Sequence, residues 1–578
     1  MSKLTDIMSS TLYTDLESDI EAFVKEKLEG YKPDNVGKKT IRDSVWGSIE
    51  YSEWEMQLID SPLFQRLRDI SQVGLASFTY PAARHSRFEH SLGVAAAAKK
   101  MCEKIKHNSG NFKFNDGDEE KICLAALLHD IGHCAHSHLS ESVISEFEVF
   151  VELKAMFNRE LGCKPKAHEL LSFIIINTTT FKTFFFDHVN YPNKNAVKAS
   201  LFHDVGKMII GANIEKDNTI FSYLTSIIYG PFDADKLDYI KRDSLTTGLS
   251  LAYDVERLFT KILVHNINNE SGHGKKEYRL VVGFNGITAL EELTFCKIML
   301  HSYIYYHQKV LTAETMIKDY LHALFKLNII KNFSDLLRYT DSNIFYLADK
   351  QEGRKPFPVP EYPMLDLQDL ADCIKNRRLP KRCFELSHTN VKSVESDVND
   401  ELIRQELQSI TDKYSTGGVS FDELEKDISA LTVVITRENP VPLDFLISEF
   451  HDLTHEKLLE KRKEFYDQLV KEYRIRKKTV NFSMFDVYIV FPKHVDYGTA
   501  SDKVVLGKDN DSLLAINDFV KLDDWAGCFN TNKWRGYVFV SEKIDRSIAF
   551  VVAEKFILKG KAKIVNPSAY IRGIDADE

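Results

Sequence analysis

The sequence predicts a mostly α-helical protein in which a helical body is followed by a small α+β lobe at the C-terminal end. From Gln57 to about Ile330, apolar residues recur with the period of helices that bury one face. The tail differs, because residues 485–491 form a run rich in β-branched and aromatic side chains, which indicates a strand. With 578 residues and 44% hydrophobic content, the chain can build several domain-sized cores.

These patterns divide the chain into four segments. Residues 1–35 are expected to form a polar arm and then a helix from Leu16 to about Leu28. Residues 36–384 form the helical body, which begins with a hairpin after Gly47. Residues 385–430 are polar and charged and are expected to connect the body to the lobe. The lobe covers residues 431–578, with strands expected at 485–491 and 503–506 and a helix at 544–558.

Composition limits the classes of partner and the cellular compartment that we expect for this protein. Lys and Arg number 75 against 85 Asp and Glu, so the net charge of −10 does not attract nucleic acid to the chain as a whole. Basic runs at 377–382 and 474–478 leave local nucleic-acid contact open, but we do not favour it, because aromatic residues hardly interleave with them. The eight cysteines form no CxxC pair, which is typical of a reducing cytosol. Neither a signal peptide nor a membrane span is apparent, so we expect a cytoplasmic protein without a membrane partner.

A histidine and an aspartate side by side are the most informative residues of the body. His129 and Asp130 end an apolar helical stretch, His90 begins another, and Asp235 is expected in a short loop after a Gly-Pro pair. Two imidazoles and two carboxylates suit a divalent metal ion such as Mn, Fe, Mg, Zn or Ni. A site of this kind leaves a coordination position for a water molecule that becomes a nucleophile near neutral pH. The pattern therefore predicts a metal-dependent hydrolase, acting on a phosphate ester.

Cationic and titratable side chains accompany these four residues along the chain, as the neutralisation of a polyphosphate requires. They are Arg87, His133, His138, His168 and Lys236. His168 also precedes an apolar helical stretch, so its alternative role is simply to begin a helix.

A second string of the same kind is present in the chain. His203 and Asp204 are followed by Val-Gly-Lys. This string lacks an upstream histidine in an Arg-Phe-Glu-His context, so we favour His129 and Asp130 as the ligand pair. We predict that His203→Ala leaves bound metal unchanged.

Four strings, in this order, resemble the HD-domain phosphohydrolase superfamily. Within it, the chain is similar to the deoxynucleotide triphosphohydrolases, including the mammalian SAM-and-HD-domain enzyme and bacterial dGTPase-like relatives. The strings are IDSPLFQRLR at 59–68, RFEHSLG at 87–93, HDIGH at 129–133 with Ser137-His138, and DADKLDYIKRD at 233–243.

The resemblance covers roughly residues 35 to 560, and residues 1–35 are too short for a SAM domain. It implies that residues 36–384 are an HD phosphohydrolase domain and that the protein self-associates as a dimer or tetramer. It also implies the reaction, in which metal-activated water attacks the α-phosphorus of a deoxynucleoside triphosphate (dNTP) and releases deoxynucleoside and triphosphate. The alternatives are hydrolysis of another nucleotide or of single-stranded nucleic acid, or nucleotide sensing by an inactive site.

The resemblance also implies roles for individual residues. The metal ligands would be His90, His129, Asp130 and Asp235. The phosphates would meet Arg87, Lys236 and Tyr239, and the catalytic set would be His133, His138, His168 and Asp233. His138 is the first choice for protonating the departing 5′-oxygen, and His133 is the second.

The sugar and base would meet a further set of residues. Gln72 and Asp243 would bind the 3′-hydroxyl, Val73 would exclude a 2′-hydroxyl, and His301 and Tyr305 would line the sugar and base. Lys297 stands where the mammalian enzyme has an arginine, and His136 replaces an aromatic residue, which leaves base preference and transition-state contacts open.

A GTP or dNTP activator is a further implied partner. Lys39, Asp60, Gln65 and Arg68 match positions that bind an activating nucleotide in the mammalian enzyme. The structural alternative is that Asp60 caps a helix and Arg68 forms an ion pair.

Overall fold

The computed structural model divides into two compact units, residues 1–378 with 495–527, and residues 379–494 with 528–578. Residues 431–578 are thus divided between the units. Most of the predicted connecting segment 385–430 lies outside the described residues. The residues described are 3–35, 37–110, 112–115, 117–192, 194–198, 200–267, 275–349, 365–387, 391–393, 448–450, 453–494, 504–506, 513–560 and 562–564.

The first unit begins with helices rather than with a polar arm. Helix α1 (Lys3–Met8) buries Leu4 and Ile7, and α2 (Thr11–Leu28) starts five residues before the predicted position. Ser10 separates the two helices, because its side chain caps α2 by accepting a hydrogen bond from the Tyr13 amide. The predicted arm is therefore wrong, whereas the predicted hairpin is confirmed as β1 (Lys39–Asp43) paired with β2 (Gly47–Tyr51).

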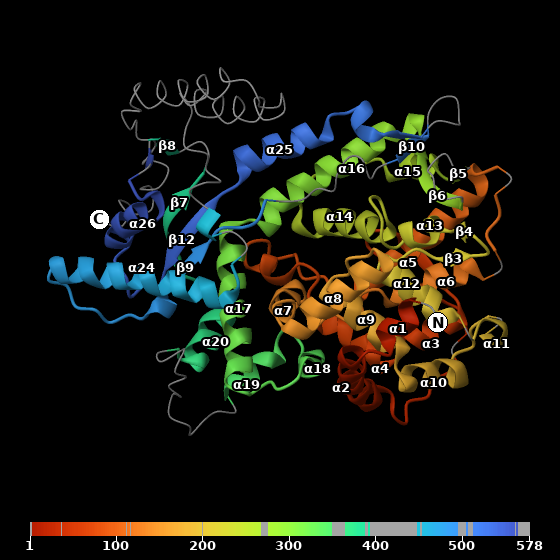
Figure 1. The fold of residues 1–578 in the computed structure, drawn as a ribbon, viewed down its shortest axis with the longest axis horizontal. Helices are drawn as coiled ribbons and strands as arrows, with labels where there is room; N and C mark the ends of the chain where they lie inside the picture. Colours follow the sequence, from red (N-terminus) through yellow and green to blue (C-terminus); the bar gives the residue numbers. More distant parts are fainter. Residues whose placement is uncertain are drawn as a thin grey trace, which may run out of the picture. The chain divides into compact units, whose positions relative to one another are not determined.

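The first unit is mostly helical, as predicted, and the long α5 (Arg87–Asn108) runs through its interior. Helix α5 packs against α6 (Asp118–Leu128) and α14 (Ala234–Thr247), and α6 packs in turn against α12 (Leu201–Ile209) (Figure 1). Gly93 permits the close approach of α5 and α14, because a Cβ atom there would lie 1.9 Å from Asp238 Oδ1. The other helices that bear on the site are α3 (Glu53–Ile59), α4 (Pro62–Gln65), η1 (Arg66–Asp69), α7 (His138–Ile144), α9 (Ala167–Asn177), α16 (Ile287–Leu300), the π-helix η4 (His301–Tyr305), α18 (Phe333–Leu337) and η5 (Asn343–Phe345).

A sheet that the sequence did not predict interrupts the helices of the first unit. Strands β5 (Ile262–Ile267) and β6 (Lys276–Gly283) form an antiparallel pair. On β6 lie the short β4 (Thr219–Ile220) and β10 (Val504–Leu506), both parallel to it. The strand expected at 503–506 is thus present, but it pairs with a strand more than two hundred residues earlier, inside the first unit.

The second unit contains the α+β structure expected of the tail. Strands β7 (Lys381–Leu386), β12 (Gly536–Val540) and β9 (Val487–Val490) form an antiparallel sheet in that order. Helices α24 (His455–Ile475) and α26 (Arg546–Leu558) share a core with it, around Phe384, Phe465 and Val538. The predicted strand at 485–491 and helix at 544–558 are confirmed.

Three side chains of the predicted basic runs pair with neighbouring carboxylates in the second unit. Arg382 pairs with Glu385, Arg476 Nε lies 2.9 Å from Glu472, and Lys478 Nζ lies 2.5 Å from Asp545. These pairs reduce the positive charge that the predicted basic runs offer to nucleic acid. In the described part of the chain, every helix is too short or too polar to cross a membrane.

Candidate metal centre

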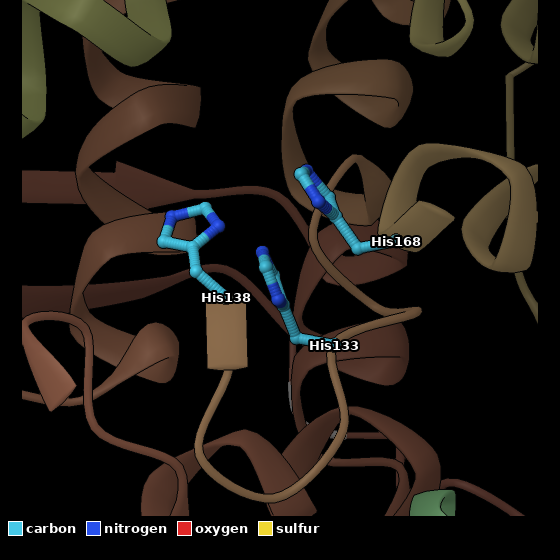
Figure 2. Close-up of side chains that lie close together, drawn as sticks. All are labelled: His133, His138 and His168. Atoms are coloured by element: carbon cyan, nitrogen blue, oxygen red, sulfur yellow. The ribbon is translucent and has the colours of Figure 1, made fainter. Parts of the chain in front are cut away.

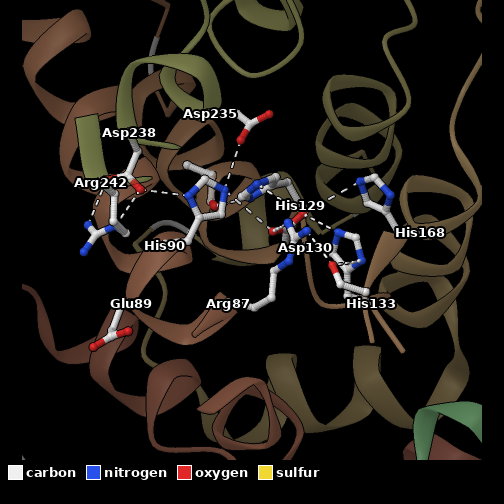
Figure 3. A network of polar contacts seen from close by, with 12 residues as sticks. Arg87, Glu89, His90, His129, Asp130, His133, His168, Asp235, Asp238 and Arg242 are labelled. Carbon is white, nitrogen blue, oxygen red and sulfur yellow. Dashed lines mark hydrogen bonds and ion pairs between the residues drawn. The ribbon is translucent and has the colours of Figure 1, made fainter. Parts of the chain in front are cut away.

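The predicted ligand residues lie together in the first unit. His90, His129 and Asp130 each offer a ligand atom, and these atoms lie within 4.8 Å of one another (Figure 3). His90 Nε2 also lies 3.0 Å from Asp235 Oδ1. His90 is in the first turn of α5, and His129 and Asp130 directly follow α6. Asp235 lies in the first turn of α14 rather than in the loop we expected, so helix ends carry all four groups.

Hydrogen bonds fix both imidazole rings so that their Nε2 atoms face the centre. His90 Nδ1 lies 2.8 Å from Asp238 Oδ2, and Asp238 is itself held by Arg242 and by the Trp46 indole N–H at 2.6 Å. His129 Nδ1 lies 2.8 Å from the Ala126 carbonyl oxygen. Within the described residues, neither Nε2 atom makes a hydrogen bond. This outer layer of carboxylate and carbonyl partners is what metal-binding histidines have.

The electrostatics of the site favour a cation. Burial opposes a charged imidazole, but Asp235 and Asp238 outweigh it and raise the pKa of His90 to about 10. Burial would raise the pKa of Asp130, yet His129 and Arg87 hold it well below its usual range. A metal ion would therefore compete with a proton for His90 Nε2. The carboxylates of Asp130, Asp235 and Asp238 favour a cation at this point. Two imidazoles and two carboxylates fit the predicted divalent metal ion, and His90, His129, Asp130 and Asp235 are the residues that would hold it.

Beside this centre, the rings of three histidines gather. His133 and His168 are stacked with ring centroids 3.9 Å apart, and His138 faces His133 edge-on at 5.2 Å (Figure 2). Their nitrogen atoms could also hold a metal ion. However, the Arg87 guanidinium lies 3.0 Å from His138 Nε2 and 2.7 Å from Asp130 Oδ2, and its positive charge opposes a second cation at this point.

Glu141 joins two of these histidines and was missed by the sequence reasoning. Its Oε2 lies 2.8 Å from His138 Nδ1 and 3.1 Å from His168 Nδ1. The available signal was its spacing, three residues after His138 on α7, which places both side chains on one helix face. Glu141 outweighs burial and raises the pKa of His168, whereas burial and Arg87 lower the pKa of His138 and hold that of His133 well below its usual range.

Residues far apart in the sequence hold the backbone between the ligand pair and the histidines. The Arg66 guanidinium donates to the carbonyl oxygens of Ile131 and His133, the latter at 2.7 Å. Ser172 Oγ accepts from the Gly132 amide at 2.9 Å and donates to the His129 carbonyl at 2.6 Å. Only glycine fits at 132, because a Cβ atom there would lie 2.3 Å from the His168 carbonyl oxygen. No local pattern pointed to Arg66 or Ser172.

Several residues expected to meet the sugar and base also lie close together. His85 Nε2 lies 2.8 Å from Asp243 Oδ1, and the Tyr305 hydroxyl donates to the other Asp243 oxygen. The His301 ring lies edge-on to Tyr305 at 4.9 Å, and burial, with the charge of Lys297, lowers the pKa of His301 to about 3. Gln72 and Val73 are both buried. His85 is a further residue that the sequence reasoning missed.

Two residues expected at the phosphates or the catalytic centre are engaged with each other. Lys236 Nζ lies 2.6 Å from Asp233 Oδ2 and 2.8 Å from the Gly230 carbonyl oxygen. Asp233 is buried and caps α14 by accepting from the Lys236 amide. A phosphate contact by Lys236 would therefore require this ion pair to open. Tyr239 was also expected at the phosphates, and burial with the nearby Asp235 carboxylate raises the pKa of its hydroxyl well above the usual value.

The residues expected to bind an activator are also neighbours. Lys39 Nζ lies 3.8 Å from Asp60 Oδ2, and Arg68 Nε donates to Gln65 Oε1 at 2.6 Å. Asp60 follows the end of α3 and does not cap the start of a helix. Arg68 lies over the Phe88 ring at 3.6 Å, so its contacts are a neutral amide and an aromatic face rather than the ion pair we weighed as the alternative.

Comparison with known proteins identifies the fold of this region. The HD domain family model matches residues 87–172, which include His90, His129, Asp130 and the three clustered histidines. The chain therefore contains an HD domain at residues 87–172. The matched HD segment begins at the first residue of α5 and ends within α9.

Two relatives and one solved structure extend this similarity. A protein of Methanocaldococcus jannaschii without a described function is 32% identical over 281 residues, which are 48% of each chain. The deoxynucleoside triphosphate triphosphohydrolase SAMHD1 homolog of Dictyostelium discoideum is 30% identical over 284 residues, which are 49% of this chain and 48% of the relative. A hypothetical protein from Aquifex aeolicus shares the fold, with a TM-score of 0.54 and 19% identity over 89% of this chain and 99% of that one.

The chain spans about half the length of the two relatives. Together with the HD domain match, these similarities confirm the predicted resemblance to the HD-domain deoxynucleotide triphosphohydrolases.

Proposed function

We propose that the protein is a metal-dependent dNTP triphosphohydrolase that releases a deoxynucleoside and intact triphosphate. The observation that carries the proposal is the meeting of His90, His129, Asp130 and Asp235 beside Arg87 and three histidine rings. The first four residues would hold a divalent metal ion, which would supply an acidified water molecule at neutral pH. The relative named as a deoxynucleoside triphosphate triphosphohydrolase supports the same reaction.

The other side chains would bind the substrate and move protons. Arg87 would neutralise charge on the phosphoryl group, from its position between Asp130 and His138. His138 remains our first choice for protonating the departing 5′-oxygen, because its side chain is 58% exposed and Glu141 fixes its Nδ1. His133 is buried behind it and is the second choice.

The sugar would be recognised by the group around Asp243. Both Asp243 oxygens already accept a hydrogen bond, from His85 and Tyr305, and each keeps a lone pair for a 3′-hydroxyl. Val73 would select a deoxyribose, because a buried valine cannot satisfy a 2′-hydroxyl. We propose that all four dNTPs, dGTP included, are better substrates than the corresponding ribonucleotides.

Product analysis tests the reaction. The full-length protein would be incubated with each dNTP and each rNTP under Mn, Mg or Fe, and the products separated by ion-exchange chromatography. Deoxynucleoside with tripolyphosphate is the expected result. Orthophosphate or a nucleoside monophosphate would instead indicate an HD phosphohydrolase of another specificity. No product under any metal would contradict the proposal and favour a nucleotide-sensing protein.

Activation by a nucleotide is a second proposal for the same enzyme. Lys39 and Asp60 side chains are 45% and 40% exposed, so a guanine base can reach them, with Gln65 and Arg68 adjacent. GTP or dGTP should then accelerate dATP hydrolysis and promote a dimer or tetramer, measured by light scattering. Asp60→Ala should remove the response to GTP without removing basal activity, and a rate that is insensitive to GTP at every ratio would count against activation. We also propose that the protein hydrolyses dNTPs in the cytoplasm.

A further inference from the structure

The Asp341 side chain joins two distant segments of the first unit. It lies between α18 and η5, and its Oδ2 accepts from the Ser71 amide at 2.8 Å, across 270 positions of sequence. Its Oδ1 accepts from the His136 amide at 2.6 Å, across 205 positions. One carboxylate thus satisfies two backbone donors that belong to different parts of the site.

One of these segments contains His136 and is the turn between His133 and His138. His136 and Ser137 both have positive φ, at 59° and 52°, and Ser137 combines this with a ψ of −115°. Side chains other than glycine rarely adopt such conformations, which persist only where the surroundings impose them. Asp341 fixes the His136 amide, and Arg87 donates to Ser137 Oγ at 2.5 Å. The turn determines where His138 lies relative to His133.

The second segment is the stretch that includes Gln72 and Val73. The Gln72 amide donates to the His85 carbonyl at 3.0 Å, and the Arg87 amide donates to the Ile70 carbonyl at 2.9 Å, so this stretch is tied to the start of α5. The Ser71 amide points instead to Asp341. Residues 70–73, which we call the sugar stretch, and residues 133–138, which we call the histidine turn, are therefore both held by Asp341.

We propose that Asp341 is a positioning residue that fixes the histidine turn 133–138 against the sugar stretch 70–73. Its role in catalysis, as opposed to its role in ordering the two segments, rests on the proposed function. The carboxylate is needed because both partners are donors. An asparagine could accept from only one of them and would turn its NH₂ group toward the other.

Hydrogen–deuterium exchange of the full-length protein tests the positioning directly, without any substrate. In Asp341→Asn, peptides covering 70–74 and 131–139 should exchange faster by about tenfold or more, since each segment loses a bond or its geometry. The matched control is Asp335→Asn, at a carboxylate of α18 that pairs with Arg338 at 2.9 Å. It should leave both peptides unchanged. Unchanged exchange of both peptides in folded Asp341→Asn and Asp341→Ala would overturn the proposal.

Kinetics test the catalytic consequence. Asp341→Asn should lower kcat by up to about 100-fold, because small displacements of catalytic groups are costly, while bound metal stays at the wild-type level. The preference for dNTP over rNTP should narrow as well, which a merely destabilising change would not cause. A wild-type kcat and sugar preference would refute the catalytic role. If the wild-type protein hydrolyses no nucleotide, the proposed function fails, and the exchange experiment still decides the positioning.

Discussion

Two His-Asp pairs of the first unit, His129-Asp130 and His203-Asp204, have surroundings that differ. Around His129 and Asp130 lie His90, Asp235 and three further histidines, and the ligand atoms of His90, His129 and Asp130 lie within 4.8 Å of one another. His203 and Asp204 lie in α12, and Asp204 Oδ2 is only 3.0 Å from Lys121 Nζ and 3.2 Å from Lys216 Nζ. In the described residues, no group of possible metal ligands includes the second pair.

The difference shows that residue type alone does not make a ligand. Asp204 is buried, but its neighbour His203 and the ammonium groups of Lys121 and Lys216 outweigh burial and hold its pKa well below the usual range. A cation would meet those ammonium groups before it met a second imidazole. Asp204 therefore anchors α12 to α6, whereas Asp130 has one guanidinium partner, Arg87, and imidazole neighbours that can themselves ligate a metal ion.

The largest effect is expected at Asp130. Asp130→Ala removes a ligand and the partner of Arg87, so dNTP hydrolysis should fall on the order of 10³-fold. Steady-state assays with saturating Mn would measure this loss, with thermal unfolding as the check that the variant is folded. A folded variant with full activity would refute the ligand assignment.

Stability rather than activity should respond at Lys121. Lys121→Met removes the buried ammonium partner of Asp204 and leaves it with the more exposed Lys216 and His203, which should cost about 3 kcal/mol of unfolding free energy. Because the folded pKa of Asp204 is depressed, its contribution is present above the unfolded pKa of about 3.9 and is lost as pH falls below it. The difference between wild type and variant in urea unfolding should therefore shrink below about pH 4. A difference that is absent at pH 7 would contradict the anchoring role.

A smaller effect is expected behind the ligands. Asp238→Asn weakens the hydrogen bond that orients His90, so the dissociation constant for the metal should rise about 10–100-fold, while excess metal restores activity. Metal titration followed by activity would measure both. Asp254→Asn, which alters the N-terminal cap of helix α15 (Val255–Phe259), is the matched control. Equal metal affinity in the two variants would argue against this orienting role.

The smallest effect belongs to the second pair. His203 is about one-third exposed and carries no ligand role in our account, so His203→Ala should change activity less than twofold and stability by less than about 0.5 kcal/mol. Loss of activity in this variant would reverse the choice between the two pairs.

Local sequence patterns predicted much of the fold and failed where distant segments pair. The helical body, the hairpin after Gly47 and the helix that ends at Leu558 follow from periodicity and capping over a few residues. The pairing of β10 with β6 joins residues near 505 and 282, and no local pattern encodes such a register. The helical start of the chain was missed because α1 is short and polar, with only Leu4 and Ile7 buried.

The candidate site divides in the same way. The ligand set could be read from the strings around His90, His129 and Asp235, since motif order and residue type identify them. The orienting groups could not, because Asp238, Glu141 and Asp341 act through contacts that only the folded chain brings about. Sequence patterns also could not show that Asp233 and Lys236, which we expected at the catalytic centre and the phosphates, form an ion pair with each other.

Elemental analysis of three purified proteins tests the central claim most directly. The wild-type protein and His203→Ala should each carry about one divalent metal ion per chain, and Asp130→Ala should carry none, because the ion is held where His90, His129, Asp130 and Asp235 meet. Metal that is retained by Asp130→Ala and lost from His203→Ala would contradict the account and place the metal centre at His203 and Asp204.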